Sequence, residues 1–199
     1  MGGYHSAKIL LKSIDYHDIM INYGIHHDVV STLLKNELSE LIALEPDCII
    51  ICCNSLHKYY DMIKVELNTS IPVMHAVELV AKHLNSIDQR SELLLATKFT
   101  MEDGFFAETL QQHNISVTLP DQGERERMDQ IHAELMQNTV TQKSRDYFAS
   151  LIKKYQSSGV VIWGCTEYPL VVDSTNSVLP IVNPICLQVS AAVNYALSI

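Results

Sequence analysis

Residues 160–170 read VVIWGCTEYPL, an apolar run that is followed at once by glycine, cysteine, threonine and a carboxylate. A short apolar run bounded by turn residues predicts a buried β-strand, here over residues 159–163. A cysteine that only filled the core would lie within such a run, whereas Cys165 lies just after it. Open α/β sheets bind their ligands beyond the carboxyl ends of the strands. Cys165 is therefore a candidate for chemistry, and that chemistry needs a partner.

Strand-like and helical segments alternate along the rest of the chain, which predicts a parallel α/β fold. The run DCIIICC at 47–53 is apolar almost throughout, as in a parallel strand that is covered on both faces. Asn54 or Ser55 is a candidate cap for the helix that follows. The other strands are expected at 7–14, 71–75, 92–97, 115–120 and 179–182, and the helices at 28–45, 54–67, 76–84, 102–113, 125–137, 143–156 and from about 186.

Composition narrows the class of partner. Of the 199 residues, 47% are hydrophobic and 19% are charged, as in an ordinary folded protein. The net charge of −9 argues against a nucleic-acid partner, because binding to phosphates needs clustered Lys and Arg. The same charge should repel an anionic membrane surface. We expect a small-molecule partner, no nucleic acid and no membrane.

The cysteines indicate a reducing compartment. No apolar stretch approaches the roughly 18 residues of a membrane-spanning helix, and the start MGGYHSAKILLKSID lacks the features of a signal peptide. These features predict a cytoplasmic location. The five cysteines should then be free thiols, and their odd number fits poorly with a disulfide framework.

A second strand end is similar to the first. The segment CCNSLH at 52–57 follows an apolar run, as GCTEYP does at 164–169, so Cys53 and Cys165 occupy matching places. Two copies of one half-domain that face each other would produce this pattern. A residue just before a helix lies near the positive end of the helix dipole, which favours a thiolate. The short donors Asn54, Ser55 and Thr166 are suited to holding a carboxylate.

Two facing thiols can invert a stereocentre without a cofactor. A thiolate removes a proton from a bound carbon acid, and a thiol returns a proton to the opposite face. Polarised N–H groups aimed at the substrate carboxylate would stabilise the carbanion-like charge. We therefore expect no cofactor.

Cysteines also serve as ordinary core residues, and this interpretation stays open for each of them. We assign Cys48, Cys52 and Cys186 to packing, since Cys52 alternates with Cys53 along the strand and should face the other way. A metal site made of Cys48, Cys52, Cys53 and His57 would lack a CxxC pair and a second half, so no metal is expected. His57 is expected on a helix surface or in a local hydrogen bond.

The stretches around the two cysteines belong to a wider resemblance. It rests on GGYHSAKILLKSIDY (2–16), CNSLHK (53–58), IPVMH (71–75), ATKFTME (96–102) and GCTEYPL (164–170), and SRDYF (144–148) and VLPIVN (178–183) fit as well. The chain resembles the aspartate/glutamate racemases, which need no cofactor, and among them the aspartate racemase branch. The resemblance implies two similar flavodoxin-like halves with the active site between them. It places the first half at 1–90 plus 182–199 and the second half at 91–181.

The resemblance also implies a role for each matching residue. Cys53 and Cys165 become the acid–base pair, and Glu167 tunes or orients the second cysteine. Thr97 and Thr100 match a hydroxyl-bearing loop at the start of the second half. Both threonines also suit a simple turn with a helix cap, and Glu167 also suits a solvated carboxylate. The residues implied to bind the substrate are Asn54, Ser55, Thr97, Thr100, Thr166 and Glu167.

One part of the family pattern is missing from this sequence. Members of the family begin with a strand, a glycine loop and a helix before the position that matches Gly2. In the strand order 2-1-3-4-5 the first strand is internal, so its absence would leave the first half incomplete, with two unpaired strand edges. Three explanations stay open: a fragment, a decayed relative, or a chain that borrows a strand from a neighbour.

Two functions from different classes follow. The first is racemisation of a small acidic amino acid, with aspartate as the expected substrate; a cysteine isomerase acting on another small dicarboxylate is close to it. The second is a catalytically inactive relative that acts as a binding or assembly module. Unpaired strand edges would cost on the order of several kcal/mol, so we also expect self-association as a homodimer.

Overall fold

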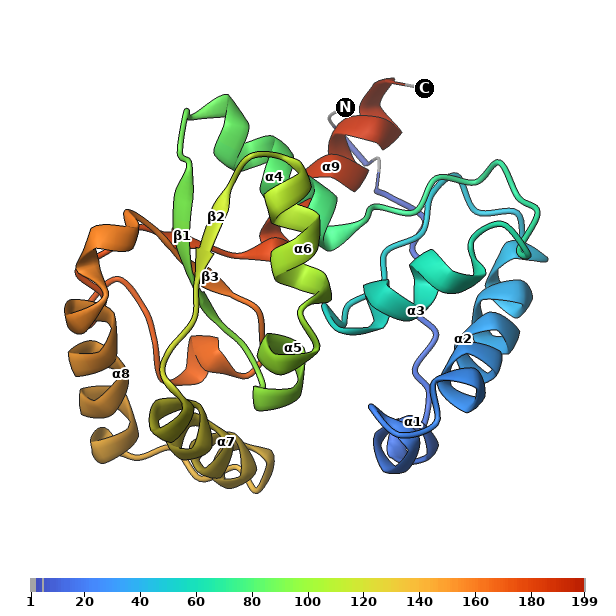
Figure 1. Ribbon diagram of the computed structural model, residues 1–199. Helices are drawn as coiled ribbons and strands as arrows, with labels where there is room; N and C mark the ends of the chain where they lie inside the picture. Colours follow the sequence, from blue (N-terminus) through green and yellow to red (C-terminus); the bar gives the residue numbers. More distant parts are fainter. Residues whose placement is uncertain (1–2, 5, 199) are drawn as a thin grey trace.

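The computed structural model describes residues 3–4 and 6–198, which form two units side by side (Figure 1). The larger unit contains a parallel sheet with the strand order β2-β1-β3-β4. Its strands are β1 (Ser91–Leu95), β2 (Ser116–Thr118), β3 (Val161–Trp163) and β4 (Ile181–Val182). This sheet confirms the predicted α/β class. Residues 1, 2, 5 and 199, which the predicted first half includes, lie outside the described residues.

Helices follow the strands much as the apolar periodicity predicts. Phe106, Ile131 and Phe148 are fully buried on three different helices, in one core cluster with Leu94 of β1. No helix of the described residues is long and apolar enough to cross a membrane. The helices are α1 (His17–Asn22), α2 (His27–Ile42), α3 (Leu56–Ile63), α4 (Ala76–Ser86), α5 (Lys98–Asp103), α6 (Phe105–Gln112), α7 (Gln122–Met136), α8 (Gln142–Lys154) and α9 (Pro184–Ser198).

Two of these helices differ from the prediction. The segment 102–113, expected as one helix, belongs to α5 and α6. Gly104 separates the two, because its φ of 85° is a left-handed conformation that ends a helical backbone. The six-residue α1 was not predicted, since it is too short to show a helical period.

The smaller unit has a core but almost no sheet. Apolar side chains of α1, α2 and α3, among them Ile19, Leu34 and Tyr59, form a second buried cluster. The strands expected at 47–53 and 71–75 meet in a single parallel bridge between Ile49 and Val73. The two predicted strands are therefore wrong in extent. A ladder needs a neighbouring strand along its whole length, and these segments pair at only one position.

The strand expected at 7–14 is also wrong. Residues 7–14 form no regular element and pair with no strand among the described residues. Ile9 and Leu11 are each 85% exposed. An extended segment becomes a strand only when a neighbour takes up its backbone groups, and in the described residues none does so here.

The core clusters divide the chain differently from the family-based boundaries. Val77, Val80 and Leu84 of α4 are buried in the cluster of the larger unit. The predicted boundary at residue 90 places α4 in the first half instead. The division into the halves 1–90 plus 182–199 and 91–181 stays a prediction from the resemblance.

Candidate active site

Cys165 follows β3 in a turn that needs glycine. A Cβ on Gly164 would lie 2.7 Å from the Cβ of Ala96 and 2.9 Å from Cδ1 of Leu94, so a side chain there would push β3 away from β1. The N–H of Gly164 donates to the carbonyl of Leu95 at 2.8 Å, which extends the strand pairing by one step. Cys165 is then held at the sheet edge with 5% of its surface exposed.

The thiol of Cys165 donates a hydrogen bond to a carboxylate. The thiol donates to Oε2 of Glu167 at 3.0 Å, and the hydroxyl of Thr166 donates to both carboxylate oxygens at 2.9 Å. On the far side, Nε2 of His132 lies 3.8 Å from the same Oε2. Glu167 is therefore an oriented group, and the solvated-carboxylate interpretation does not describe it.

These contacts shift the pKa of two groups in opposite directions. The interaction with His132 lowers the pKa of Glu167 to about 2, against the opposing effect of burial, and the Cys165 and Thr166 contacts add to it. Burial raises the pKa of Cys165 well above its usual value, and the charge of Glu167 raises it further. At neutral pH this arrangement pairs a protonated thiol with an ionised carboxylate.

His132 on α7 was missed in the sequence analysis. A signal was present, because His132 lies four residues after Met128 and three before Leu135, two buried residues on the core-facing side of α7. Its partner Glu167 follows β3, far away in the chain, so the helical period shows which way His132 faces but not what it meets.

Cys53 lies in the smaller unit beside two hydroxyl groups. Its Sγ is 3.4 Å from Oη of Tyr16 and 3.4 Å from Oγ of Ser55. Burial, followed by the charge of a Cys53 thiolate, raises the pKa of Tyr16. The side chain of Ser55 makes no capping bond to α3, so the capping hypothesis was wrong, because this hydroxyl contacts the sulfur instead. Tyr16 was also missed.

Asn54 joins the two cysteine-bearing segments. Its side-chain amide donates to the carbonyl of Trp163, the last residue of β3, at 3.3 Å. Its Oδ1 is buried and has no hydrogen-bond partner among the described residues. The charge of Cys53 is also among the causes that raise the pKa of Cys165, after burial and the charge of Glu167.

A cavity of ≈280 Å³ opens beside Cys165. The predicted site residues Asn54, Cys165 and Thr166 line it, together with Cys52, Trp163, Pro169, Asn183 and Ile185. Cys53 is not among the lining residues, so a void shared by Cys53 and Cys165 stays a prediction. The cavity is large enough for a small amino acid.

The assignment of three cysteines to packing needs correction. Cys52 and Cys186 are exposed and Cys48 is half-buried, although all five cysteines are free thiols as expected. Cys52 lines the cavity beside Cys165, whereas Cys53 is not among its lining residues. Of the two alternatives for His57, the helix surface is wrong, because the side chain is fully buried, and the local hydrogen bond is confirmed, since Nε2 lies 3.3 Å from the carbonyl of Ile51.

Thr97 and Thr100 form the start of α5. Thr97 caps the helix by accepting from the N–H of Thr100 at 3.3 Å, and the two hydroxyls lie 2.9 Å apart. Thr100 is only 2% exposed. The capping interpretation is therefore confirmed, and a further role of these hydroxyls in binding substrate stays a prediction.

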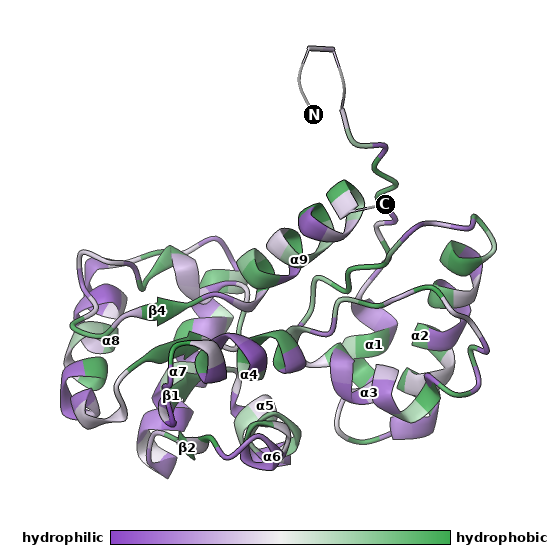
Figure 2. Cartoon of the chain, turned by 90° about the horizontal axis from the view of Figure 1, so that it is seen from above, coloured by the Kyte–Doolittle hydropathy of each residue, from purple (hydrophilic) through white to green (hydrophobic). Residues whose placement is uncertain are grey.

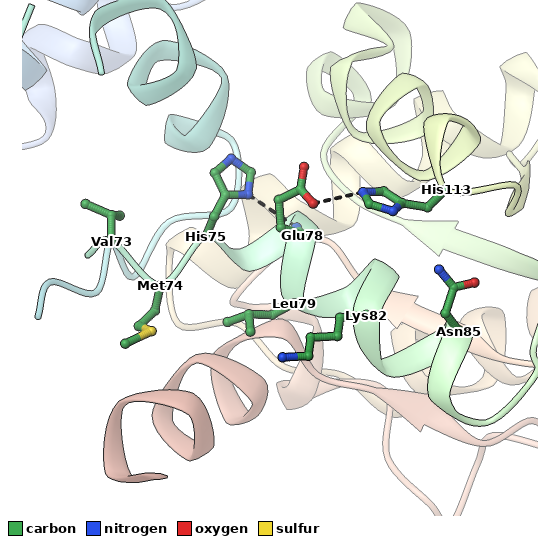
Figure 3. A pocket seen from close by; sticks show the side chains of 8 residues that line it. All are labelled: Val73, Met74, His75, Glu78, Leu79, Lys82, Asn85 and His113. Carbon is green, nitrogen blue, oxygen red and sulfur yellow. Dashed lines mark hydrogen bonds and ion pairs between the residues drawn. The ribbon is translucent and has the colours of Figure 1, made fainter. Parts of the chain in front are cut away.

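A larger depression of ≈510 Å³ lies at α4 (Figure 3). Its polar groups are largely engaged with one another: His113 contacts the carboxylate of Glu78 at 2.8 Å, and the ring of His75 accepts from the N–H of Glu78. None of the predicted site residues lines this depression. Asn54, Cys165 and Thr166 line the smaller cavity instead.

The chain is similar in sequence to known racemases. The family model described as Asp/Glu/Hydantoin racemase matches residues 5–195. Over 195 residues, the chain is 25% identical to the broad specificity amino-acid racemase RacX of Bacillus subtilis, covering 92% of this chain and 84% of that protein. It is 24% identical to a glutamate racemase of a Hydrogenobaculum species, covering 92% and 73% respectively.

Solved structures share the fold. A crystal structure of a candidate Asp/Glu racemase from Yersinia pestis superposes with a TM-score of 0.87 at 33% identity, covering 98% of this chain and 86% of that one. An aspartate racemase homologue from Pyrococcus horikoshii gives a TM-score of 0.82 at 24% identity with the same coverage. At that identity, the second likeness speaks for the fold alone.

Proposed function

The chain belongs to the family of Asp/Glu/hydantoin racemases, and on that premise we propose that it racemises a small acidic amino acid, aspartate in the first place, with Cys53 and Cys165 as the acid–base pair. The family makes it an amino-acid racemase, an isomerase. The observation that carries the proposal is the hydrogen-bonded pair of Cys165 and Glu167 beside a cavity. The choice of aspartate rests on the Thr-Glu pair after Cys165, which matches the aspartate racemase branch.

In the proposed scheme Cys165 is the acid that gives a proton and Cys53 is the base that takes one. Burial and the charge of Glu167 raise the pKa of Cys165, which keeps its proton in place. Two hydroxyls, of Tyr16 and Ser55, lie close enough to Cys53 to donate to a sulfur anion. A thiol acid and a thiolate base are the two groups that racemisation requires.

In the proposed reaction the sulfur of Cys53 takes the proton from the α-carbon, and the electron pair left behind is delocalised into the substrate carboxylate. The Cys165 thiol then gives its proton to the opposite face. The products are the inverted amino acid, a Cys53 thiol and a Cys165 thiolate. The next turnover runs in the other direction, so atoms and charges balance without a cofactor.

The substrate-binding roles are proposed for Asn54, Ser55, Thr97, Thr100, Thr166 and Glu167. Two features support part of this set. Asn54 and Thr166 line the cavity together with Cys165. The buried Oδ1 of Asn54 has no hydrogen-bond partner among the described residues, so it can accept a hydrogen bond from an ammonium or amide group of a ligand.

The test is hydrogen exchange at the α-carbon in deuterated water, with L-aspartate and L-glutamate as substrates. Cys53→Ala and Cys165→Ala should each lower the rate by about 10²–10⁴-fold or more. Cys52→Ala is the matched control, because Cys52 lines the cavity but has no role in the proposal. Activity that survives either of the first two substitutions, or is lost in the control alone, refutes the two-thiol scheme.

A second candidate is a catalytically inactive relative that binds an acidic amino acid or assembles with other chains. The single strand bridge of the smaller unit favours it, since this unit holds Cys53. Calorimetry with aspartate and glutamate separates the two candidates. Binding without turnover supports the inactive relative, and turnover eliminates it.

We also propose a cytoplasmic location and a homodimer. The five free cysteines support the location, because free thiols persist in a reducing compartment. The exposed apolar residues before α1 support self-association.

A further inference from the structure

Three classical metal ligands meet behind the candidate cavity. The ligand atoms of His132, Cys165 and Glu167 all lie within 4.8 Å of one another. Two of the ligands come from the turn after β3 and the third from α7, which lies next to that turn (Figure 1). The cluster is mostly shielded: the side chain of Glu167 is 32% exposed, that of His132 is 18% exposed, and Cys165 is buried.

We propose that these three residues form a reversible binding site for a borderline-soft divalent cation, Zn²⁺ in the first place. The site would need no further protein ligand, because three protein ligands and one open position are a common Zn²⁺ arrangement. The open position can be filled by water or by a carboxylate in the cavity that Cys165 lines. The sequence analysis expected no metal, because the set it weighed, Cys48, Cys52, Cys53 and His57, lacks a CxxC pair and a second half.

The distances suit a tetrahedral ion. With typical Zn–S, Zn–N and Zn–O bond lengths, the ligand atoms of such a site are about 3.4–3.6 Å apart. In the structure, Sγ of Cys165 is 3.0 Å and Nε2 of His132 is 3.8 Å from Oε2 of Glu167. All three ligand atoms lie within 4.8 Å of one another, so the longest separation would have to shorten by up to about 1.2 Å to form a coordination shell, which side-chain torsions can supply.

The charges suit the ion as well. Binding replaces the thiol proton of Cys165 with the metal: the S–H bond breaks, an S–Zn bond forms and the proton leaves to the buffer. The resulting thiolate and the carboxylate of Glu167 balance the two positive charges, and His132 binds as a neutral imidazole. Sulfur and nitrogen ligands discriminate against Mg²⁺ and Ca²⁺, which prefer oxygen.

The consequence for catalysis rests on the proposed function. A metal-bound Cys165 has no proton to give, so Zn²⁺ would switch off a racemase that uses this thiol, and a chelator would restore it. The binding itself does not depend on whether the chain is active.

The test is a titration of the reduced, full-length chain with Co²⁺, whose bond to a thiolate gives a charge-transfer absorption, followed by displacement with Zn²⁺. We expect one Co²⁺ per chain and release of one proton from Cys165. Cys165→Ala should abolish the absorption, and His132→Gln should weaken Co²⁺ binding by at least about tenfold. His132 is partly exposed, so this variant keeps the test valid even if Cys165→Ala fails to fold.

Two controls are matched to the site. His113→Gln breaks another contact between a histidine and a carboxylate, with Glu78, that has no cysteine beside it (Figure 3). Cys53→Ala removes the other candidate catalytic thiol. Both should bind Co²⁺ as the parent chain does. The proposal is overturned if His132→Gln leaves the affinity unchanged, or if the absorption is lost in Cys53→Ala and retained in Cys165→Ala.

The two proposals can fail independently. A chain that binds Co²⁺ at this site but exchanges no α-hydrogen refutes the proposed function and leaves the metal site standing. A chain that racemises aspartate and shows no thiolate–metal absorption refutes the metal site alone.

Discussion

Glu92 is a carboxyl group buried in the apolar core. It lies on β1, is fully buried, and neither carboxylate oxygen has a hydrogen-bond partner among the described residues. Burial raises its pKa well above the ordinary value of a glutamate. The folded protein therefore holds this proton more tightly than the unfolded chain does, and the contribution of Glu92 to stability is lost as the pH rises through the raised pKa.

Replacement of Glu92 by an apolar residue of similar size should stabilise the protein. For Glu92→Met, we expect the free energy of unfolding at pH 8 to exceed that of the parent chain by roughly 1–3 kcal/mol, because an unpaired polar group leaves the core. The gain should shrink as the pH falls towards 4.5, the ordinary pKa of glutamate, where the unfolded chain begins to bind the same proton. Urea unfolding at pH 5, 6.5 and 8 measures it.

The control for Glu92 is an exposed glutamate. Glu108 on α6 is exposed, so Glu108→Met should give no gain that grows with pH. If the stability curves of Glu92→Met and the parent chain run parallel between pH 5 and 8, Glu92 does not titrate as its burial requires.

Some residues of the candidate site could be predicted from the sequence and others could not. Glu167 meets Cys165 because they are two residues apart, so a role for this carboxylate could be predicted from the motif. His132 and Tyr16 reach the two sulfur-bearing segments across long stretches of chain. Only folding brings them there, and the sequence offers no local pattern for either contact.

At the start of α5, Thr97 has two interpretations that experiment can separate. Thr97 both caps the helix and is proposed to bind substrate. Thr97→Ala should lower the free energy of unfolding by about 1 kcal/mol, because the N–H of Thr100 loses its acceptor. If Thr97 also binds substrate, KM for aspartate should rise in this variant. Thermal unfolding and initial-rate kinetics measure the two effects.

Thr97→Ser is the matched variant, since serine keeps the hydroxyl and caps helices as well as threonine does. It should restore stability and KM together. A Thr97→Ala chain that is destabilised but has an unchanged KM would leave Thr97 as a helix cap only.

Elements were predictable where both periodicity and a neighbour were present. The strand containing Leu94 and the helices that cover it follow from their apolar patterns, because each buries that pattern against the others. The strand containing Ile49 was predicted from an equally apolar run but makes one bridge. Apolar sequence indicates a buried segment, whereas a ladder also requires a partner that lies elsewhere in the chain.

For the whole molecule, polar contacts join α9 to the smaller unit. The buried side chain of Gln188 donates to the carbonyls of Ile51 and Met74 at 3.2 and 2.6 Å, and it lies 3.2 Å from Nε2 of His57. Burial, with the nearby His75, lowers the pKa of His57 to about 3. His57 is thus neutral at neutral pH, and it acts as an interior contact and not as a surface group.

Apolar side chains are exposed on α9 and on the segment before α1. Ile9 and Leu11 are 85% exposed, and Val189, Val193 and Leu197 on α9 are each at least half exposed. Figures 1 and 2 both show the described residues from 6 to the start of α1 passing the C-terminal end of α9. Unpaired backbone groups beside apolar side chains favour pairing with a second chain. The net charge of −9 opposes such pairing, and salt screens that repulsion.

We therefore expect the chain to form dimers at high protein concentration, and more so as the salt concentration rises. Sedimentation velocity should show a mass near twice 22.4 kDa. The double variant Ile9→Lys with Leu11→Lys should return the mass to that of one chain, because two added charges cannot be buried between partners. Val65, also 85% exposed but in the loop after α3, supplies the control, and Val65→Lys should leave the dimer intact. A parent chain that remains a monomer under all these conditions excludes the homodimer.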